Sequence, residues 1–174
     1  MDTIKLDIKE RLQLSFQLKI LEKLYPEEEE YYANHRKAIE DGYELHYSWI
    51  AENISEGLST EECKEVLDIL DMYMAMYISF LALKNPQKLS IDSIIFPGFD
   101  GNNETMRMLY TKYFIEDLNR FEEIQKLTKG EYNSHTEMIP TYKNMLEKWN
   151  QFPFEESHSL NEEQLLDLIN TRGY

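Results

Sequence analysis

The sequence predicts an all-α protein, a compact multihelical domain of about seven helices arranged around a central helix from Ser59 to Leu83. Three observations lead to this fold class. Apolar residues recur at three- and four-residue steps through most of the chain. Capping-box signatures mark two helix starts, at Ser59 and at Asn161. No internal repeat, low-complexity tract or Gly/Ser-rich linker interrupts residues 1–174, so we expect one domain.

The central helix begins at a capping box, in which Ser59 and Glu62 exchange side-chain and backbone hydrogen bonds. Its apolar positions follow helical spacing: Cys63, Val66, Leu67, Leu70, Tyr73, Met74, Tyr77, Phe80 and Leu81. From Met72 to Leu83 there is no charged residue. We therefore expect other helices or a second subunit to surround this half. Its twelve residues are too few to cross a bilayer, which needs about twenty.

The N-terminal third of the chain predicts three helices. The first runs from Lys5 to Tyr25 and ends before Pro26, which cannot continue the hydrogen-bond ladder. The second runs from Glu27 to Asp41, where Gly42 suits the left-handed backbone that ends a helix. The third is aromatic-rich and runs from Tyr43 to Asn53. The first helix carries two apolar ridges: Ile8, Leu12 and Phe16 on one, and Leu14, Leu18, Leu21 and Tyr25 on the other. We expect neighbours on two of its sides.

After the central helix, the segment Gln87 to Asn103 lacks helical periodicity and contains a Pro97-Gly98 turn signal. Long loops in compact domains are often functional, so Phe96 to Asn103 is the first place to look for a site. Three further helices are predicted: Glu104 to Lys126, Glu137 to Asn150 with Thr136 as its cap, and Glu162 to Ile169 with an Asn161 and Gln164 capping box.

Composition narrows the possible functions. With 33 acidic and 18 basic residues, the chain has a net charge of −15, which disfavours binding to nucleic acid or to a phospholipid surface. The lone Cys63 cannot form an internal disulfide and fits a small buried hydrophobe. Met1 to Lys9 lacks a secretory apolar region, so we expect a cytoplasmic protein. Twelve Tyr, eight Phe and eight Met favour a homo-oligomer, because these residues are enriched at interface centres.

Motifs for catalysis or metal binding are sparse. The four histidines are scattered, and no nucleotide-binding or nucleophile signature is present. One group of acidic residues is a candidate metal site. Glu61, Glu62, Glu65 and Asp68 lie at helical spacing and offer oxygen ligands for Mg²⁺. This EExxE pattern is similar to that of MazG-type nucleotide pyrophosphatases. Those enzymes also need an ExxD on a second helix shortly downstream, and no residues between Phe80 and Asn103 provide one. A solvated polar helix face is therefore the favoured interpretation.

Several blocks together resemble the YfbU family of bacterial proteins. They are RLQLSFQ at Arg11 to Gln17, EDGYEL at Glu40 to Leu45, ECKEVLDILDMY at Glu62 to Tyr73, FPGFD at Phe96 to Asp100, NSHTEM at Asn133 to Met138, YKNMLEKW at Tyr142 to Trp149, and LNEEQLLDLIN at Leu160 to Asn170. The resemblance implies a compact all-helical, self-associating fold with no assigned reaction and no known catalytic residues. Family members carry a histidine where Met74 stands, so an activity that depended on it would be absent here.

The first functional hypothesis is a non-enzymatic, homo-oligomeric interaction or regulatory factor without metal or cofactor. Its predicted binding residues form a surface loop and a second segment: Phe96, Gly98, Phe99, Asp100, Asn133 and His135. Two alternatives stay open. One is an acidic binder of a basic protein partner. The other is a Mg²⁺-dependent hydrolase of a phosphorylated small molecule that uses the EExxE carboxylates.

Overall fold

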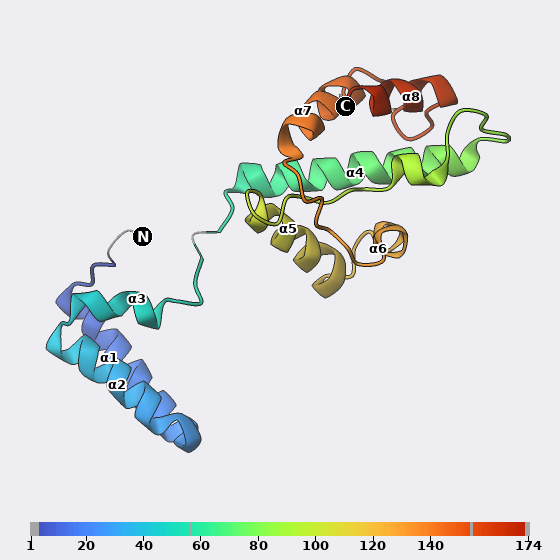
Figure 1. The fold of residues 1–174 in the computed structure, drawn as a ribbon. Helices are drawn as coiled ribbons and strands as arrows, with labels where there is room; N and C mark the ends of the chain where they lie inside the picture. Colours follow the sequence, from blue (N-terminus) through green and yellow to red (C-terminus); the bar gives the residue numbers. More distant parts are fainter. Residues whose placement is uncertain (1–3, 56, 154, 173–174) are drawn as a thin grey trace. The chain divides into compact units, whose positions relative to one another are not determined.

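The computed structural model describes residues 4–55, 57–153 and 155–172, and its chain divides into two compact units, Met1–Glu56 and Gly57–Tyr174 (Figure 1). Within these described ranges there are eight α-helices and no β-strand. The only extended pairing among them is an isolated parallel bridge between Phe99 and Asn133. The predicted all-α fold class is confirmed.

The first unit is a helical hairpin with a short third helix. Its elements are α1 (Ile8–Leu24), the 3₁₀ turn η1 (Pro26–Glu28), α2 (Glu29–Asp41), the 3₁₀ turn η2 (Glu44–His46) and α3 (Tyr47–Ile50). In Figure 1, α1 and α2 lie side by side along their length. Gly42 closes α2 in the predicted left-handed conformation, with φ of 76°. The third helix is much shorter than the predicted Tyr43 to Asn53.

α1 begins three residues later than predicted because Asp7 and Glu10 form a capping box. The Glu10 backbone N–H donates to Asp7 Oδ1, and the Asp7 backbone N–H donates to Glu10 Oε2, both at 2.8 Å. The buried apolar cluster of this unit is small: Leu18, Ile39 and Tyr47, flanked by partly buried Leu14 and Leu21. Leu14, Leu18 and Leu21 of the second predicted ridge therefore face inward, whereas its last residue, Tyr25, is 45% exposed.

The second unit is built around α4 (Thr60–Ala82), with the other helices packed along it (Figure 1). These are the 3₁₀ turn η3 (Ile91–Ile94), α5 (Thr105–Lys112), the π-helical turn η4 (Tyr113–Asp117), α6 (Glu122–Thr128), α7 (Ile139–Trp149) and α8 (Glu162–Asn170). The capping boxes predicted at Ser59 and Asn161 are both present.

Burial along α4 agrees only in part with the predicted apolar positions: Val66, Leu70 and Tyr73 are buried, whereas Cys63, Leu67, Met74, Tyr77 and Phe80 are half-buried. Val66, Ile69, Leu70, Met72 and Met76 are fully buried in the core of this unit. However, Ile78 and Leu81 are 46% and 61% exposed. The expectation that the uncharged half of α4 has no water-facing side is therefore wrong within the single chain.

The predicted helix from Glu104 to Lys126 is two helices, because the backbone turns between them. Asn119 and Phe121 both have φ of 52°, a left-handed conformation that an α-helix cannot contain. No glycine or proline marks this break, so the sequence pattern could not locate it. No helix in the described part of the chain is long and apolar enough to cross a membrane.

Removing the cap of α4 tests how much this helix start contributes. Ser59 Oγ accepts the Glu62 backbone N–H at 3.1 Å, and Glu62 Oε2 accepts the Ser59 N–H at 2.9 Å. We expect Ser59→Ala to lower the free energy of unfolding by about 1 kcal/mol, measured by urea denaturation. Ser55→Ala, at an exposed position outside the helices, is the control. Equal values for the two variants would contradict the role of the cap.

Candidate functional site

The two segments that the sequence predicts as a working surface lie next to each other in the second unit. The Phe99 backbone N–H donates to Tyr132 O at 2.9 Å, and the Ser134 N–H donates to Phe99 O at 3.1 Å. These two bonds hold the FPGFD loop beside the NSHT segment. We call this pair of segments the loop junction, residues 96–104 and 132–136.

Most of the predicted binding residues in the loop junction point inward. Phe96, Phe99 and Asp100 are 3%, 0% and 3% exposed, and Gly98 is also buried. Asn133 is half-buried, and His135 is exposed. The prediction of a surface loop is therefore wrong for the first four residues. Of the six, Asn133 and His135 are the ones that a partner can reach.

The aromatic residues of the loop belong to the core. Phe96 packs edge-on against Phe99 and Tyr73, with ring centroids 5.7 and 5.2 Å apart. Tyr142 lies against the same rings and donates its hydroxyl hydrogen bond to Gly98 O. Edge-to-face and stacked aromatic contacts of these kinds are favourable beyond the area that they bury. The FPGF run thus anchors the loop to α4 and α7.

Gly98 is required by a close approach of two backbones. Its φ is 90°, and a Cβ atom built there would lie 2.0 Å from Tyr132 O. No other residue fits without moving one of the two segments. This glycine therefore allows the two segments of the loop junction to lie in contact.

The polar side chains of the loop junction mainly hold its own backbone. Asp100 Oδ1 accepts the Asn102 backbone N–H at 3.1 Å, and Asp100 Oδ2 accepts Asn103 Nδ2 at 2.6 Å. These bonds, that of the Asn102 N–H first, lower the pKa of the Asp100 carboxyl. Asn133 Oδ1 accepts the N–H groups of Gly101 and His135 at 3.0 and 2.9 Å.

Glu104 is the residue of this region that sequence reasoning missed. It is 7% exposed, and its carboxylate accepts three backbone N–H groups. Oε1 receives those of Met138 and Ile139 at 2.9 and 2.8 Å, and Oε2 receives that of Asp100 at 2.9 Å. Glu104, and not the predicted Thr136, therefore supplies the cap at the start of α7. A glutamate before a helix is too ordinary in sequence to signal this role.

A groove of about 580 Å³ opens beside the loop junction. Its lining includes Ile91, Ile95, Phe96, Pro97, Lys126 and Asn133. The groove combines apolar side chains with two lysines, Lys126 and Lys129, and two carboxylates, Asp92 and Glu131. A ligand at the predicted site would use this space.

The EExxE carboxylates do not converge on a metal site. Glu62 Oε1 and Glu65 Oε2 lie 3.0 and 3.3 Å from Arg107 Nη2, and Glu65 Oε1 lies 3.4 Å from Lys143 Nζ. The Ser59 backbone N–H, and then Arg107, lower the pKa of Glu62. Glu61 and Asp68 are exposed on the helix surface.

No three His, Cys, Asp or Glu side chains in the described ranges lie close enough together to hold a metal ion. The arrangement around Arg107 is an ion-pair network that joins α4 to α5. It gives the Mg²⁺ hypothesis no support.

Glu104→Ala tests whether the carboxylate holds the loop junction together. The change leaves three backbone N–H groups without their acceptor, so we expect a loss of about 3 kcal/mol in the free energy of unfolding by urea denaturation. Glu104→Gln keeps one acceptor oxygen and should lose less. Glu123→Ala, at an exposed position on α6, is the matched control. A loss in Glu104→Ala no larger than in this control would contradict the assignment.

The lowered pKa of Asp100 predicts a pH dependence of stability. Because the folded-state pKa lies below the ordinary 3.8, the stabilisation is complete above that value. It is lost as the pH falls through the folded-state pKa. We expect the difference in unfolding free energy between wild type and Asp100→Asn, measured from pH 6 down to about pH 3, to shrink at the acidic end. A difference independent of pH would contradict this prediction.

Comparison with known proteins places this architecture in a family. The family model described as the YfbU domain matches residues 4–171, which spans both units. A curated relative, a UPF0304 protein of Methanocaldococcus jannaschii, is 36% identical over 166 residues, covering 92% of this chain and 96% of the relative. This relative is archaeal, so the similarity reaches beyond the bacterial proteins that the sequence blocks resemble. The chain belongs to the YfbU family.

Proposed function

We propose that this protein acts through protein contacts, as a homo-oligomeric interaction factor, and not as a catalyst. The observation that carries the proposal is the distribution of apolar side chains in the first unit, Met1–Glu56. Asn133 and His135, the two predicted binding residues that a partner can reach, form a second contact point in this proposal. A reducing, cytoplasmic setting is part of it and is supported by the single Cys63.

The first unit exposes more large apolar side chains than it buries. On α1, Ile8, Leu12, Phe16, Ile20 and Leu24 are 82%, 54%, 55%, 58% and 65% exposed. We call these five residues the α1 ridge. Leu45, Trp49 and Ile54 are also more than half exposed. In the described residues 4–55, the buried apolar residues are Leu18, Ala38, Ile39 and Tyr47. Exposed apolar surface of this extent indicates that another surface binds and covers these side chains.

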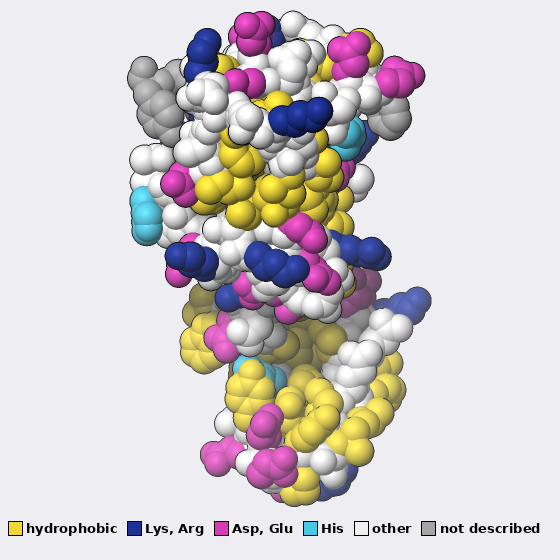
Figure 2. Space-filling model, turned by 90° about the vertical axis from the view of Figure 1, so that its right-hand side faces the viewer, with side chains coloured by type: hydrophobic (Ala, Val, Ile, Leu, Met, Phe, Trp, Pro, Cys, Tyr) yellow, Lys and Arg dark blue, Asp and Glu magenta, His cyan; other side chains and the backbone are white. Residues whose placement is uncertain are grey.

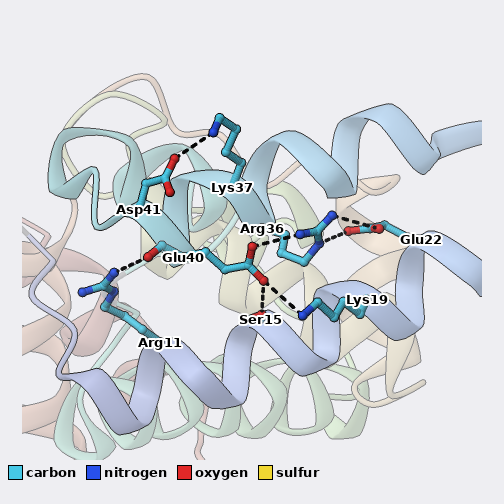
Figure 3. A network of polar contacts seen from close by, with 8 residues as sticks. All are labelled: Arg11, Ser15, Lys19, Glu22, Arg36, Lys37, Glu40 and Asp41. Atoms are coloured by element: carbon cyan, nitrogen blue, oxygen red, sulfur yellow. Dashed lines mark hydrogen bonds and ion pairs between the residues drawn. The ribbon is translucent and has the colours of Figure 1, made fainter.

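Polar contacts between α1 and α2 help to explain why the residues of the α1 ridge remain exposed. Between α1 and α2, Arg36 Nε donates to Glu22 Oε1 at 2.6 Å, and Ser15 Oγ donates to Glu40 Oε1 at 2.6 Å (Figure 3). Ser15 and Glu22 are only 4% and 8% exposed. Polar side chains thus occupy part of the contact between the helices, and the α1 ridge remains outside it.

The surface view supports an interaction role. Figure 2 shows hydrophobic side chains gathered into patches between charged ones on the face that it presents. Contiguous exposed apolar patches on proteins mark contacts with other molecules more often than chance exposure. Of the alternatives, the acidic binder is supported by the net charge of −15 alone. The hydrolase is disfavoured because Glu62 and Glu65 pair with Arg107.

Native mass spectrometry with a variant of the α1 ridge tests the proposal. We expect the wild-type protein at micromolar concentration to have a multiple of the 20.9 kDa chain mass. Phe16→Asp places a charge in the contact and should raise the dissociation constant at least about tenfold.

The control is Leu81→Asp, at a residue of α4 that is 61% exposed, and it should keep the wild-type mass. Circular dichroism checks that both variants remain helical. A wild-type protein that stays monomeric at all concentrations would overturn the proposed function.

A further inference from the structure

We infer that the α1 ridge binds the α1 ridge of a second copy, antiparallel, across a two-fold axis that passes beside Phe16. This inference rests on the proposed function and names the partner and the geometry of its contact. Three features of the first unit lead to it: the spacing of the ridge, the charges around it and the area that it leaves uncovered.

The spacing of the ridge is symmetric about its centre. Ile8 and Leu12 precede Phe16 at four-residue steps, and Ile20 and Leu24 follow it at the same steps. At about 1.5 Å of rise per residue, successive ridge residues are about 6 Å apart along the helix. Each four-residue step also turns about 40° around the helix, so Leu12, Phe16 and Ile20 share one face about 80° wide, whereas Ile8 and Leu24 lie toward its two sides. A two-fold axis beside Phe16 therefore pairs Phe16 with itself and Leu12 with Ile20. Such self-complementarity is what a two-fold interface requires.

A hollow beside the ridge is available to a partner's side chains. A groove of about 420 Å³ is lined by Ile8, Leu12 and Phe16 from the ridge and by Ile39 from α2. Arg11 is held at its edge, because its Nε donates to Ile39 O at 2.7 Å and its Nη2 donates to Glu40 O at 2.6 Å. The ridge thus offers both projecting side chains and a recess for them, as packed interface centres do.

The charges around α1 favour the antiparallel direction. Two copies with a net charge of −15 repel each other over most of their surface. α1 carries four basic residues, Lys9, Arg11, Lys19 and Lys23, and two carboxylates, Glu10 and Glu22, so most of the negative charge lies elsewhere. Lys19 and Lys23 pair with Glu40 and Glu29 of the same unit. Glu22 is turned inward against Arg36. A parallel pair would bring the acidic turns at Glu27 to Glu30 together, whereas an antiparallel pair moves each turn toward the partner's Lys9.

The ridge leaves apolar area uncovered. Its five side chains are between 54% and 82% exposed. A standard interface buries about 800 Å² on each partner. The ridge can therefore supply the apolar centre of one such interface.

Cysteine cross-linking tests the geometry directly. In a Cys63→Ala background, Phe16→Cys places two thiols across the proposed axis, and mild oxidation should give a covalent dimer on a non-reducing gel. Leu12→Cys mixed with Ile20→Cys should give the mixed dimer, whereas Leu12→Cys alone should react slowly. The matched control is Leu81→Cys, which has a similar exposure of 61%. We expect Phe16→Cys to react at least about tenfold faster than this control, because the paired thiols have a high effective concentration.

The outcomes separate the geometry from the proposed function. Fast reaction of Phe16→Cys, with the mixed pair following, supports the antiparallel dimer. If native masses show an oligomer but Phe16→Cys reacts no faster than Leu81→Cys, the ridge contact is overturned while the proposed function stands. Leu12→Cys reacting with itself as fast as Phe16→Cys would overturn the antiparallel direction. A monomer in every measurement would overturn both proposals.

Discussion

The second unit depends on one buried carboxylate. Glu104 accepts backbone N–H groups from Asp100 in the FPGFD loop and from Met138 and Ile139 at the start of α7. A single side chain thus fixes a loop and a helix that are distant in sequence. Two main-chain hydrogen bonds through Phe99 and the close approach at Gly98 complete the junction. With the junction in place, the aromatic rings of the loop pack between α4 and α7.

The two units differ in how completely they bury their apolar side chains. In the second unit, α4 collects apolar side chains from the helices around it, and the buried cluster is extensive. In the first unit, ion pairs and hydrogen bonds take part of the contact between α1 and α2, and a complete apolar ridge is left outside. Such a surface has a clear use in a protein that works by contact. In the loop junction, by contrast, most polar side chains form hydrogen bonds to the backbone of the junction itself.

The sequence was enough to locate much of the candidate site, but not to predict which of its side chains are buried. The absence of helical periodicity and the Pro97-Gly98 turn identified the loop, and the structure brings it beside the NSHT segment. The inward direction of Phe96 and Phe99 depends on rings supplied by α4 and α7, which no local pattern reveals. In the same way, the spacing of the EExxE carboxylates suggests a metal site. In the structure, Glu62 and Glu65 pair instead with Arg107, which comes from another helix.

The sequence by itself determined the all-α class, the starts of α4 and α8, and the end of α2 at Gly42, because capping and helical periodicity act within a few residues. It also indicated membership of the YfbU family through ordered blocks. Only the tertiary structure decided which ridge of α1 faces inward, where the helix after Glu104 breaks, and that Glu104 caps α7. Each of these depends on groups far apart in the chain, and their meeting is set by packing and backbone hydrogen bonding across the fold.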